Sequence, residues 1–144
     1  MRLRKLIAAA GVATTVAGFG LVSAGQASAI IADCSGSHSV CLYYNPSTYG
    51  YGAVIKQGFD MPDYTNYYFS PSNNGSGGAG VPAKNNASAV DSWYGGTFTI
   101  YFSPNFSCSV GCVTIPAWAT MDLTGAANDH NASGAFTGGV PAAE

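Results

Sequence analysis

The four cysteines constrain the fold of this chain more than any other sequence feature. They occur as two close couples, Cys34 with Cys41 and Cys108 with Cys112, separated by residues 42–107. Four cysteines allow three pairings, and this spacing favours the two local disulfides Cys34–Cys41 and Cys108–Cys112. A zinc site is the alternative use of four cysteines, because a Cys-x3-Cys couple is an acceptable ligand spacing. The redox state of the compartment in which the protein resides decides between disulfides and a zinc site, since disulfides persist in oxidising environments.

The N-terminus has the pattern of a secretory signal peptide over residues 1–29. A basic start at residues 2–5 precedes an apolar run over residues 6–22, and the segment ends in Ala27-Ser28-Ala29. An uncleaved membrane anchor is the alternative, because an apolar run of about 17 residues is near the lower limit for crossing a bilayer. The Ala-x-Ala end favours cleavage after Ala29. We therefore expect a secreted, extracellular protein with disulfides rather than zinc.

Cleavage would leave residues 30–144, which is enough for one domain that buries roughly two thirds of its unfolded surface. The only basic residues in this part are Lys56 and Lys84, against seven acidic residues, so its formal charge is −5. Nucleic acids and anionic membranes attract clustered Lys and Arg. We therefore expect neither as a partner once the signal peptide is removed.

Short, regularly interrupted segments predict an all-β fold. Gly, Pro or Asn breaks the chain about every eight to twelve residues, which is the spacing of a sandwich of short strands. No segment after residue 29 has a convincing apolar period of 3.6 residues, which an amphipathic helix would show. The expected strands are residues 40–44, 53–57, 67–70, 88–93, 97–102 and 113–116.

An internal repeat divides the domain into two similar units. The segment VCLYYNPS, Val40 to Ser47, aligns without gaps to FTIYFSPN, Phe98 to Asn105. Later in each unit comes an Asn-Ala-Ser triplet, at residues 86–88 and 131–133. Two similar units, each opening with an aromatic strand and hairpin, predict paired four-strand Greek keys. Their expected bounds are about residues 38–94 and 96–138.

Three local features together resemble a known family. A cysteine couple precedes the first aromatic strand, KNNASAV at Lys84 to Val90 is followed by Trp93, and the second unit contains the couple Cys108 and Cys112. The chain from Cys34 to about Phe136 is similar to the secreted bacterial proteins related to the Streptomyces metalloproteinase inhibitor. That resemblance implies a βγ-crystallin-like sandwich of two Greek keys.

Catalysis is not expected from this sequence. The chain has two histidines, His38 and His130, and neither lies in a spacing that places a nucleophile, a base and an orienting group together. Asp60 and Asp63 are separated by Met-Pro, which is a turn sequence and favours turn or capping roles. We therefore expect a protein that binds rather than an enzyme.

Calcium binding is also not expected, although many crystallin-type Greek keys bind it through an N/D-N/D-x-x-S/T-S loop. Aligning that motif on Ser88 gives a cation, Lys84, at the first ligand position and Ala89 at the last. Aligning it on Ser133 gives only half a motif, beginning at Asp129. We expect no metal and no other cofactor, and we interpret Ser88 and Ser133 as structural hydroxyls that satisfy backbone groups.

The segment Cys108-Ser109-Val110-Gly111-Cys112 is the candidate functional loop. A disulfide across it would make a rigid loop that enters a protease cleft without the usual ordering cost and holds the ends together after a cut. The resemblance implies that the bond presented to the zinc is Cys108–Ser109. Thermolysin-like clefts prefer a bulky apolar residue after the cut. With Ser109 at that position the inhibitor would lack this hydrophobic anchor, which costs about 2 kcal/mol of binding free energy. Val110 is one position too late to supply it.

These observations predict a secreted, monomeric inhibitor of an extracellular zinc metalloprotease. One alternative is an antimicrobial, killer-toxin-like module that binds cell-wall glycan through aromatic side chains, whose flat faces and polar tips suit sugars. The other alternative is a structural extracellular protein with a crystallin-like fold. The aromatic candidates for glycan binding are Tyr43, Tyr44, Tyr49, Tyr51, Tyr67, Tyr68, Trp93, Tyr101, Phe102 and Trp118.

Overall fold

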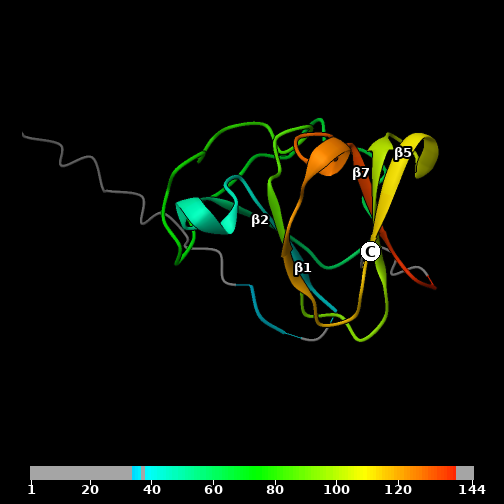
Figure 1. The fold of residues 1–144 in the computed structure, drawn as a ribbon, viewed down its shortest axis with the longest axis horizontal. Helices are drawn as coiled ribbons and strands as arrows, with labels where there is room; N and C mark the ends of the chain where they lie inside the picture. Colours follow the sequence, from blue (N-terminus) through cyan, green and yellow to red (C-terminus); the bar gives the residue numbers. More distant parts are fainter. Residues whose placement is uncertain (1–33, 37, 139–144) are drawn as a thin grey trace, which may run out of the picture.

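The computed structural model describes residues 34–36 and 38–138, and the expected signal peptide lies outside this part. Within it the chain forms two antiparallel β-sheets and no α-helix, so the predicted all-β class is confirmed. Figure 1 shows the sheets as two layers, with β1 and β2 in one and β5 and β7 in the other. The strands are β1 (Val40–Tyr43), β2 (Val54–Gln57), β3 (Ala89–Ser92), β4 (Phe98–Ser103), β5 (Ser107–Ile115), β6 (Thr120–Asp122) and β7 (Ser133–Phe136), with 3-10 turns η1 (Ser47–Tyr49) and η2 (Gly125–Ala127).

The strands expected near β1, β2, β3 and β4 are present, but three other expectations need correction. Residues 67–70 form no strand and make only isolated bridges, Val54 with Ser70 and Tyr68 with Pro82. Strand β5 begins at Ser107 rather than at residue 113. Strands β6 and β7 were not expected, because β6 is short and largely exposed and β7 contains Gly and Ala, which have low strand propensity.

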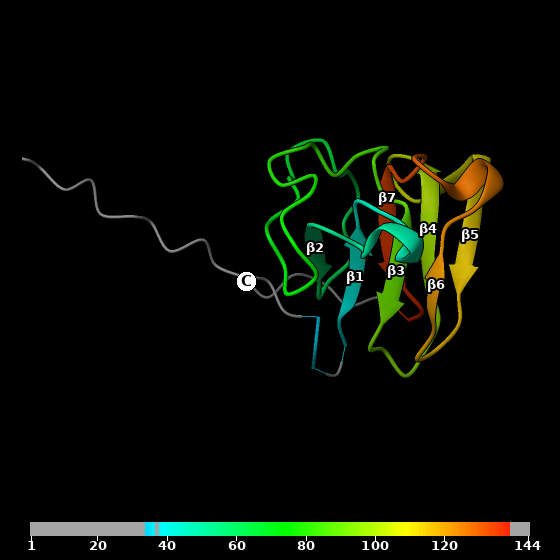
Figure 2. The same cartoon turned by 60° about the vertical axis from the view of Figure 1, so that its left-hand side comes forward.

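The two halves of the chain exchange segments between the sheets. One sheet has the order β2-β1-β3-β6 and the other β5-β4-β7, so β6 from the second half completes the sheet of the first half (Figure 2). In the other direction, Met61 from the first half forms an antiparallel bridge with Gly134 in β7. A further tie joins η1 to β6, because the backbone N–H and hydroxyl of Ser47 donate to the Asp122 carboxylate, each at 2.7 Å. Neither half therefore completes its fold alone.

The core lies between the two sheets and is built by alternate residues of the central strands. In β1 the inward residues are Val40 and Leu42, and in β4 they are Phe98 and Ile100, all fully buried. Leu42 and Ile100 are paired in the repeat, so the two units contribute the same positions to one core. Each such side chain stabilises the fold by about 1.5–3 kcal/mol when removed from water.

A buried polar network ties the first half to β7. The hydroxyl of fully buried Tyr64 donates to Gln57 Oε1 at 2.6 Å, and Gln57 Nε2 donates to the Gly134 carbonyl at 2.7 Å. Burial raises the pKa of Tyr64 well above its usual value, so the phenol remains a donor. A Cβ at Gly134 would overlap the Tyr64 hydroxyl and the Phe98 ring. The absence of a side chain at Gly134 is therefore what allows the halves to approach.

Replacing Gly134 with Ala should destabilise the protein by about 1–3 kcal/mol, because the new methyl group overpacks this junction. The melting temperature should fall by roughly 4 °C or more. Gly58→Ala is the matched control, since the nearest atom to a Cβ there is the His38 carbonyl oxygen at 3.8 Å. Equal melting temperatures for the two variants would contradict the tight junction.

Candidate functional site

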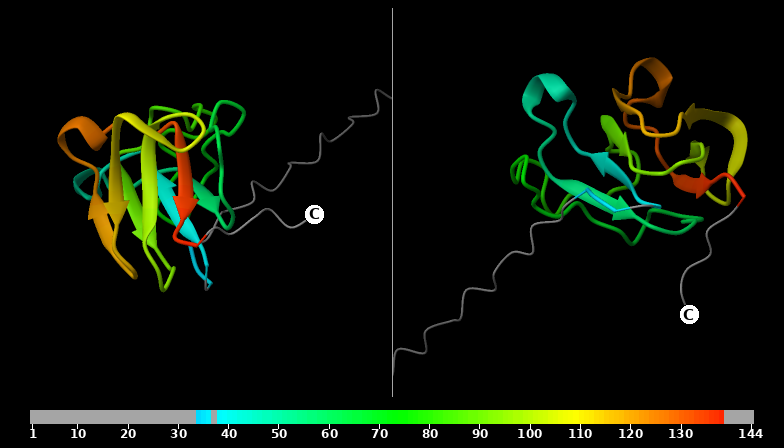
Figure 3. Two further views of the ribbon diagram at one scale, coloured as in Figure 1. Left: turned by 90° about the vertical axis from the view of Figure 1, so that its right-hand side faces the viewer. Right: turned by 90° about the horizontal axis from the view of Figure 1, so that it is seen from below.

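The candidate loop is an insertion in an edge strand. Among the described strands β5 pairs only with β4, and Figure 3 shows this yellow strand at the margin of the molecule in its right-hand view. Tyr101 pairs with Cys112 and Ser103 with Ser107, so residues 108–111 lie opposite the single residue Phe102. Extra residues on one strand of a pair form a β-bulge, which bends the strand away from its partner. The loop is therefore a large bulge that projects from β5.

A disulfide closes the base of this bulge. Cys108 and Cys112 are bonded, with their Cα atoms 5.1 Å apart, as the spacing predicted. Both cysteines are exposed, and so are the Ser109 and Val110 side chains at the tip. Because the cross-link joins the two points where the bulge leaves and rejoins the strand, it limits the conformations that the tip can adopt.

The inner side of the bulge rests on an aromatic ring. A Cβ at Gly111 would overlap the Phe102 ring, so this glycine allows the backbone to lie directly on the ring. The Phe102 ring also lies near His130, with ring centroids 6.0 Å apart. Sequence reasoning did not assign Phe102 this role. The repeat pairs Phe102 with Tyr44, and in the structure Tyr44 packs in the same way against Gly78.

The two tip residues differ in what holds them. Ser109 is tied back along the strand, because its N–H donates to Ser107 Oγ at 3.3 Å and its own Oγ accepts from that hydroxyl at 3.0 Å. Val110 is 73% exposed, so its apolar side chain projects into solvent. Of the two residues, Val110 is therefore the one that the loop presents to solvent as an apolar contact.

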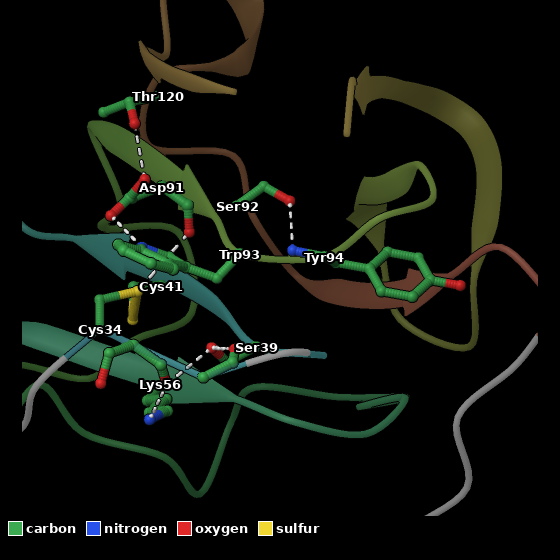
Figure 4. The surroundings of a disulfide bond; sticks show 11 residues. Cys34, Ser39, Cys41, Lys56, Asp91, Ser92, Trp93, Tyr94 and Thr120 are labelled. Carbon is green, nitrogen blue, oxygen red and sulfur yellow. Dashed lines mark hydrogen bonds between the residues drawn. A yellow bond between two sulfur atoms is a disulfide. The ribbon is translucent and has the colours of Figure 1, made fainter. Parts of the chain in front are cut away.

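The other disulfide has a different environment. Cys34 and Cys41 are bonded, as predicted, and both are buried, with Cys41 fully inaccessible. They pack on the outer face of the first sheet with Tyr43, Val54 and Ala89. Figure 4 shows this disulfide beneath the segment from Asp91 to Tyr94. This cross-link holds the chain before β1 against the sheet.

Ser88 and Ser133 occupy different positions. Ser133 donates to the Ser103 carbonyl at 2.8 Å and accepts from the Phe106 N–H at 3.2 Å. Ser88 instead donates to the Asp129 carboxylate at 3.4 Å. The strand registers explain the difference, because Tyr43 pairs with Ala89 whereas Tyr101 pairs with Ser133. The two Asn-Ala-Ser triplets are thus offset by one residue and are not structural equivalents.

The two weak calcium-motif loops lie side by side, since the Asp129 N–H donates to Ala87 O at 3.0 Å. Lys84, which occupies the first ligand position, forms an ion pair with Asp63 at 3.0 Å. Hydrogen bonds from Thr65 and Lys84 hold the pKa of Asp63 below its usual value. Across residues 34–36 and 38–138, no three His, Cys, Asp or Glu side chains gather in a way that would hold a metal ion.

The histidines and Asp60 each have contacts with other groups of the domain. The His38 ring packs on Tyr94 with centroids 5.5 Å apart, and His130 Nδ1 lies 2.8 Å from the Asn128 carbonyl oxygen. Asp60 accepts the Phe136 N–H at 2.8 Å. His38 and Asp60 are linked through two aromatic residues, because the Tyr94 ring also packs on Phe136 with ring centroids 4.9 Å apart.

Comparisons with known proteins yield no match, whether with protein-family models, curated proteins or solved structures. In the described part of the chain, no helix has the length and apolar character needed to span a membrane.

The contrast between the two disulfides predicts selective reduction. A thiol reductant must reach a sulfur atom to exchange with it, so the exposed Cys108–Cys112 bond should react well before the buried Cys34–Cys41 bond. Limited dithiothreitol followed by alkylation and peptide mapping should label Cys108 and Cys112 first, by at least about tenfold in rate. Equal labelling of all four cysteines in folded protein would contradict the burial difference.

Proposed function

We propose that this chain is a secreted protease inhibitor of the βγ-crystallin type, which acts on extracellular zinc metalloproteases through residues 108–112. The single observation that carries the proposal is the exposed, disulfide-closed bulge in edge strand β5. The two disulfides agree with an extracellular location and with the predicted signal peptide.

The strand exchange supports the crystallin-type architecture. Three strands of each half form the body of one sheet, and each half adds a segment to the other sheet, through β6 in one direction and Met61 in the other. Such an exchange is what two interlocked Greek keys would produce. The repeat-related strands β1 and β4 occupy corresponding places, each between two neighbours of its own half.

Strand β5 also suits recognition by a protease. Extended peptides add to exposed strand edges through main-chain hydrogen bonds, and side chains then select the partner. Among the described strands β5 has an unpaired outer edge, and its bulge is already held by Cys108–Cys112 and by Phe102. A loop with its shape fixed in advance loses little entropy on binding. If the enzyme cuts the loop, the disulfide keeps the new ends at high effective concentration.

The exposed valine suggests which side chain enters the enzyme. Val110 is 73% exposed, whereas Ser109 is bonded to Ser107. We therefore assign Val110 to the pocket that accepts an apolar residue after the cut, which makes Ser109–Val110 the presented bond. The resemblance instead implies Cys108–Ser109, and the two assignments differ in which substitution should matter.

Titration against a thermolysin-like enzyme tests the proposal. Val110→Ala should weaken inhibition by about tenfold or more, equivalent to roughly 1.4 kcal/mol, because the apolar anchor is lost. Ser109→Ala is the matched control from the same loop and should change the inhibition constant by less than about threefold.

If Val110→Ala is neutral and Ser109→Val tightens inhibition by about tenfold, the presented bond is Cys108–Ser109 and our assignment of Val110 is wrong. A panel of zinc and serine proteases should accompany the titration. Absence of inhibition throughout the panel at micromolar protein would contradict the proposed function itself.

A further inference from the structure

Both tryptophans of the chain lie in neighbouring connections at one end of the sandwich. Trp93 follows β3 and Trp118 precedes β6, and they are 42% and 62% exposed. The two connections run together, because the Trp118 N–H donates to Tyr94 O at 3.2 Å and the Ser92 N–H donates to Ala119 O at 2.9 Å. Figure 2 shows these connections at the end where β3 finishes. The two segments are therefore neighbours, and exposed large aromatic side chains on neighbouring segments are typical of a binding surface.

Trp118 has an unfavourable backbone conformation. Its φ angle is +57°, a left-handed value that bulky residues rarely adopt. Its ring lies over Gly95, where an added Cβ would be 3.4 Å from Trp118 Cζ2. Such outliers cost of order 1–3 kcal/mol and cluster at functional sites. A turn that needed only to connect two strands would be more stable with Gly or Asn at this position.

Trp93 is fixed by a chain of hydrogen bonds. Its indole N–H donates to one Asp91 carboxylate oxygen at 2.9 Å, and the other oxygen accepts the Thr120 hydroxyl at 2.6 Å. Figure 4 shows this chain of side chains beside the buried disulfide. The ring orientation is thereby set before any ligand arrives, which lowers the entropy cost of binding.

The chemistry of this surface indicates a sugar ligand. Flat aromatic rings beside a carboxylate and a hydroxyl offer stacking together with polar contacts. Pyranose rings joined by β-1,4 bonds carry equatorial substituents and expose flat C–H faces. The excess of acidic over basic residues after residue 29 disfavours anionic polysaccharides. We propose that Trp93 and Trp118 form a binding site for neutral β-1,4-linked glycans of glucose or N-acetylglucosamine.

This site is separate from the loop at 108–112. The loop lies near the start of β5, whereas Trp118 follows the end of that strand. Occupation of one surface therefore leaves the other free. The proposal would place a protease-binding loop and a glycan-binding surface on one small extracellular domain, so that the protein can be retained at a polysaccharide while its loop remains accessible.

Intrinsic fluorescence tests the proposal directly, because both tryptophans of the chain belong to the site. Cellohexaose and chitohexaose are the two ligand arms, and maltohexaose, whose α-linked rings present no continuous flat face, is the ligand control. We expect a saturable change in tryptophan emission with at least one β-1,4-linked ligand and none with maltohexaose.

Variants locate the site. Trp118→Asn, which keeps a residue that tolerates the left-handed turn, should weaken binding by about tenfold or more, since stacked aromatic residues act as binding hot spots. Trp93→Ala should do the same when followed by calorimetry. Tyr49→Ala is the control, because Tyr49 is 79% exposed but lies in η1.

No saturable response to either β-1,4-linked ligand at millimolar concentration would overturn the proposal. Equal binding of maltohexaose, or equal loss of binding in Tyr49→Ala, would overturn it as well. Protease inhibition by Trp118→Asn should match that of the parent protein, so failure of the glycan site and failure of the inhibitory loop are distinguishable.

Discussion

The exchange of segments between the two halves is the constraint on which the rest of the structure depends. Strand β6 of the second half completes the sheet of the first half. In the opposite direction, Met61 of the first half forms a β-bridge with Gly134 in the second sheet. Gln57 and Tyr64 secure this crossing with hydrogen bonds buried in the core. In a protein interior an unpaired polar group costs about 1–3 kcal/mol, so the network specifies one arrangement of the halves.

The halves repeat their core but differ at their edges, and this difference creates the candidate site. In the first half the chain after β2 folds back over it, and Val54 exchanges two backbone hydrogen bonds with Ser70, each at 2.8 Å. In the second half η2 lies near β5, but no described strand pairs with its outer edge, and β5 carries a disulfide-closed bulge instead. In the proposed function this bulge is the part of the domain that a protease would bind.

Sequence reasoning predicted the features that depend on local pattern. Cysteine spacing was sufficient for both disulfides, and the regular interruption of the chain by Gly, Pro and Asn was sufficient to place β1 and β4. It did not predict β6 or β7, whose short or glycine-containing sequences become strands only because β3 and β4 supply partners. It also treated residues 108–112 as a free-standing loop. Their place within an edge strand follows from the register between Tyr101 and Cys112, which no local pattern encodes.

Side-chain roles in the site were predictable only in part. The segment 108–112 was identified from its cysteines. The choice of Val110 over Ser109 as the contact residue rests instead on the exposure of Val110 and on the hydrogen bonds that hold Ser109 to Ser107, which only the structure shows. The support from Phe102 depends on the absence of a side chain at Gly111, seen only once the two strands are paired. Aromatic composition likewise indicated a glycan platform without distinguishing core rings from the two exposed tryptophans.

The position at which a target protease cuts the protein is the most direct test of the central claim, that the clamped bulge is what the enzyme binds. The protein is incubated with a stoichiometric amount of a zinc protease that it inhibits, and the reaction is quenched in acid. The intact mass of the protein is then measured by mass spectrometry before and after reduction. Our account predicts a single cut within residues 108–112, with the two fragments held together until the disulfide is reduced. A cut elsewhere, or inhibition that persists after the loop is replaced by a two-residue turn, would contradict it.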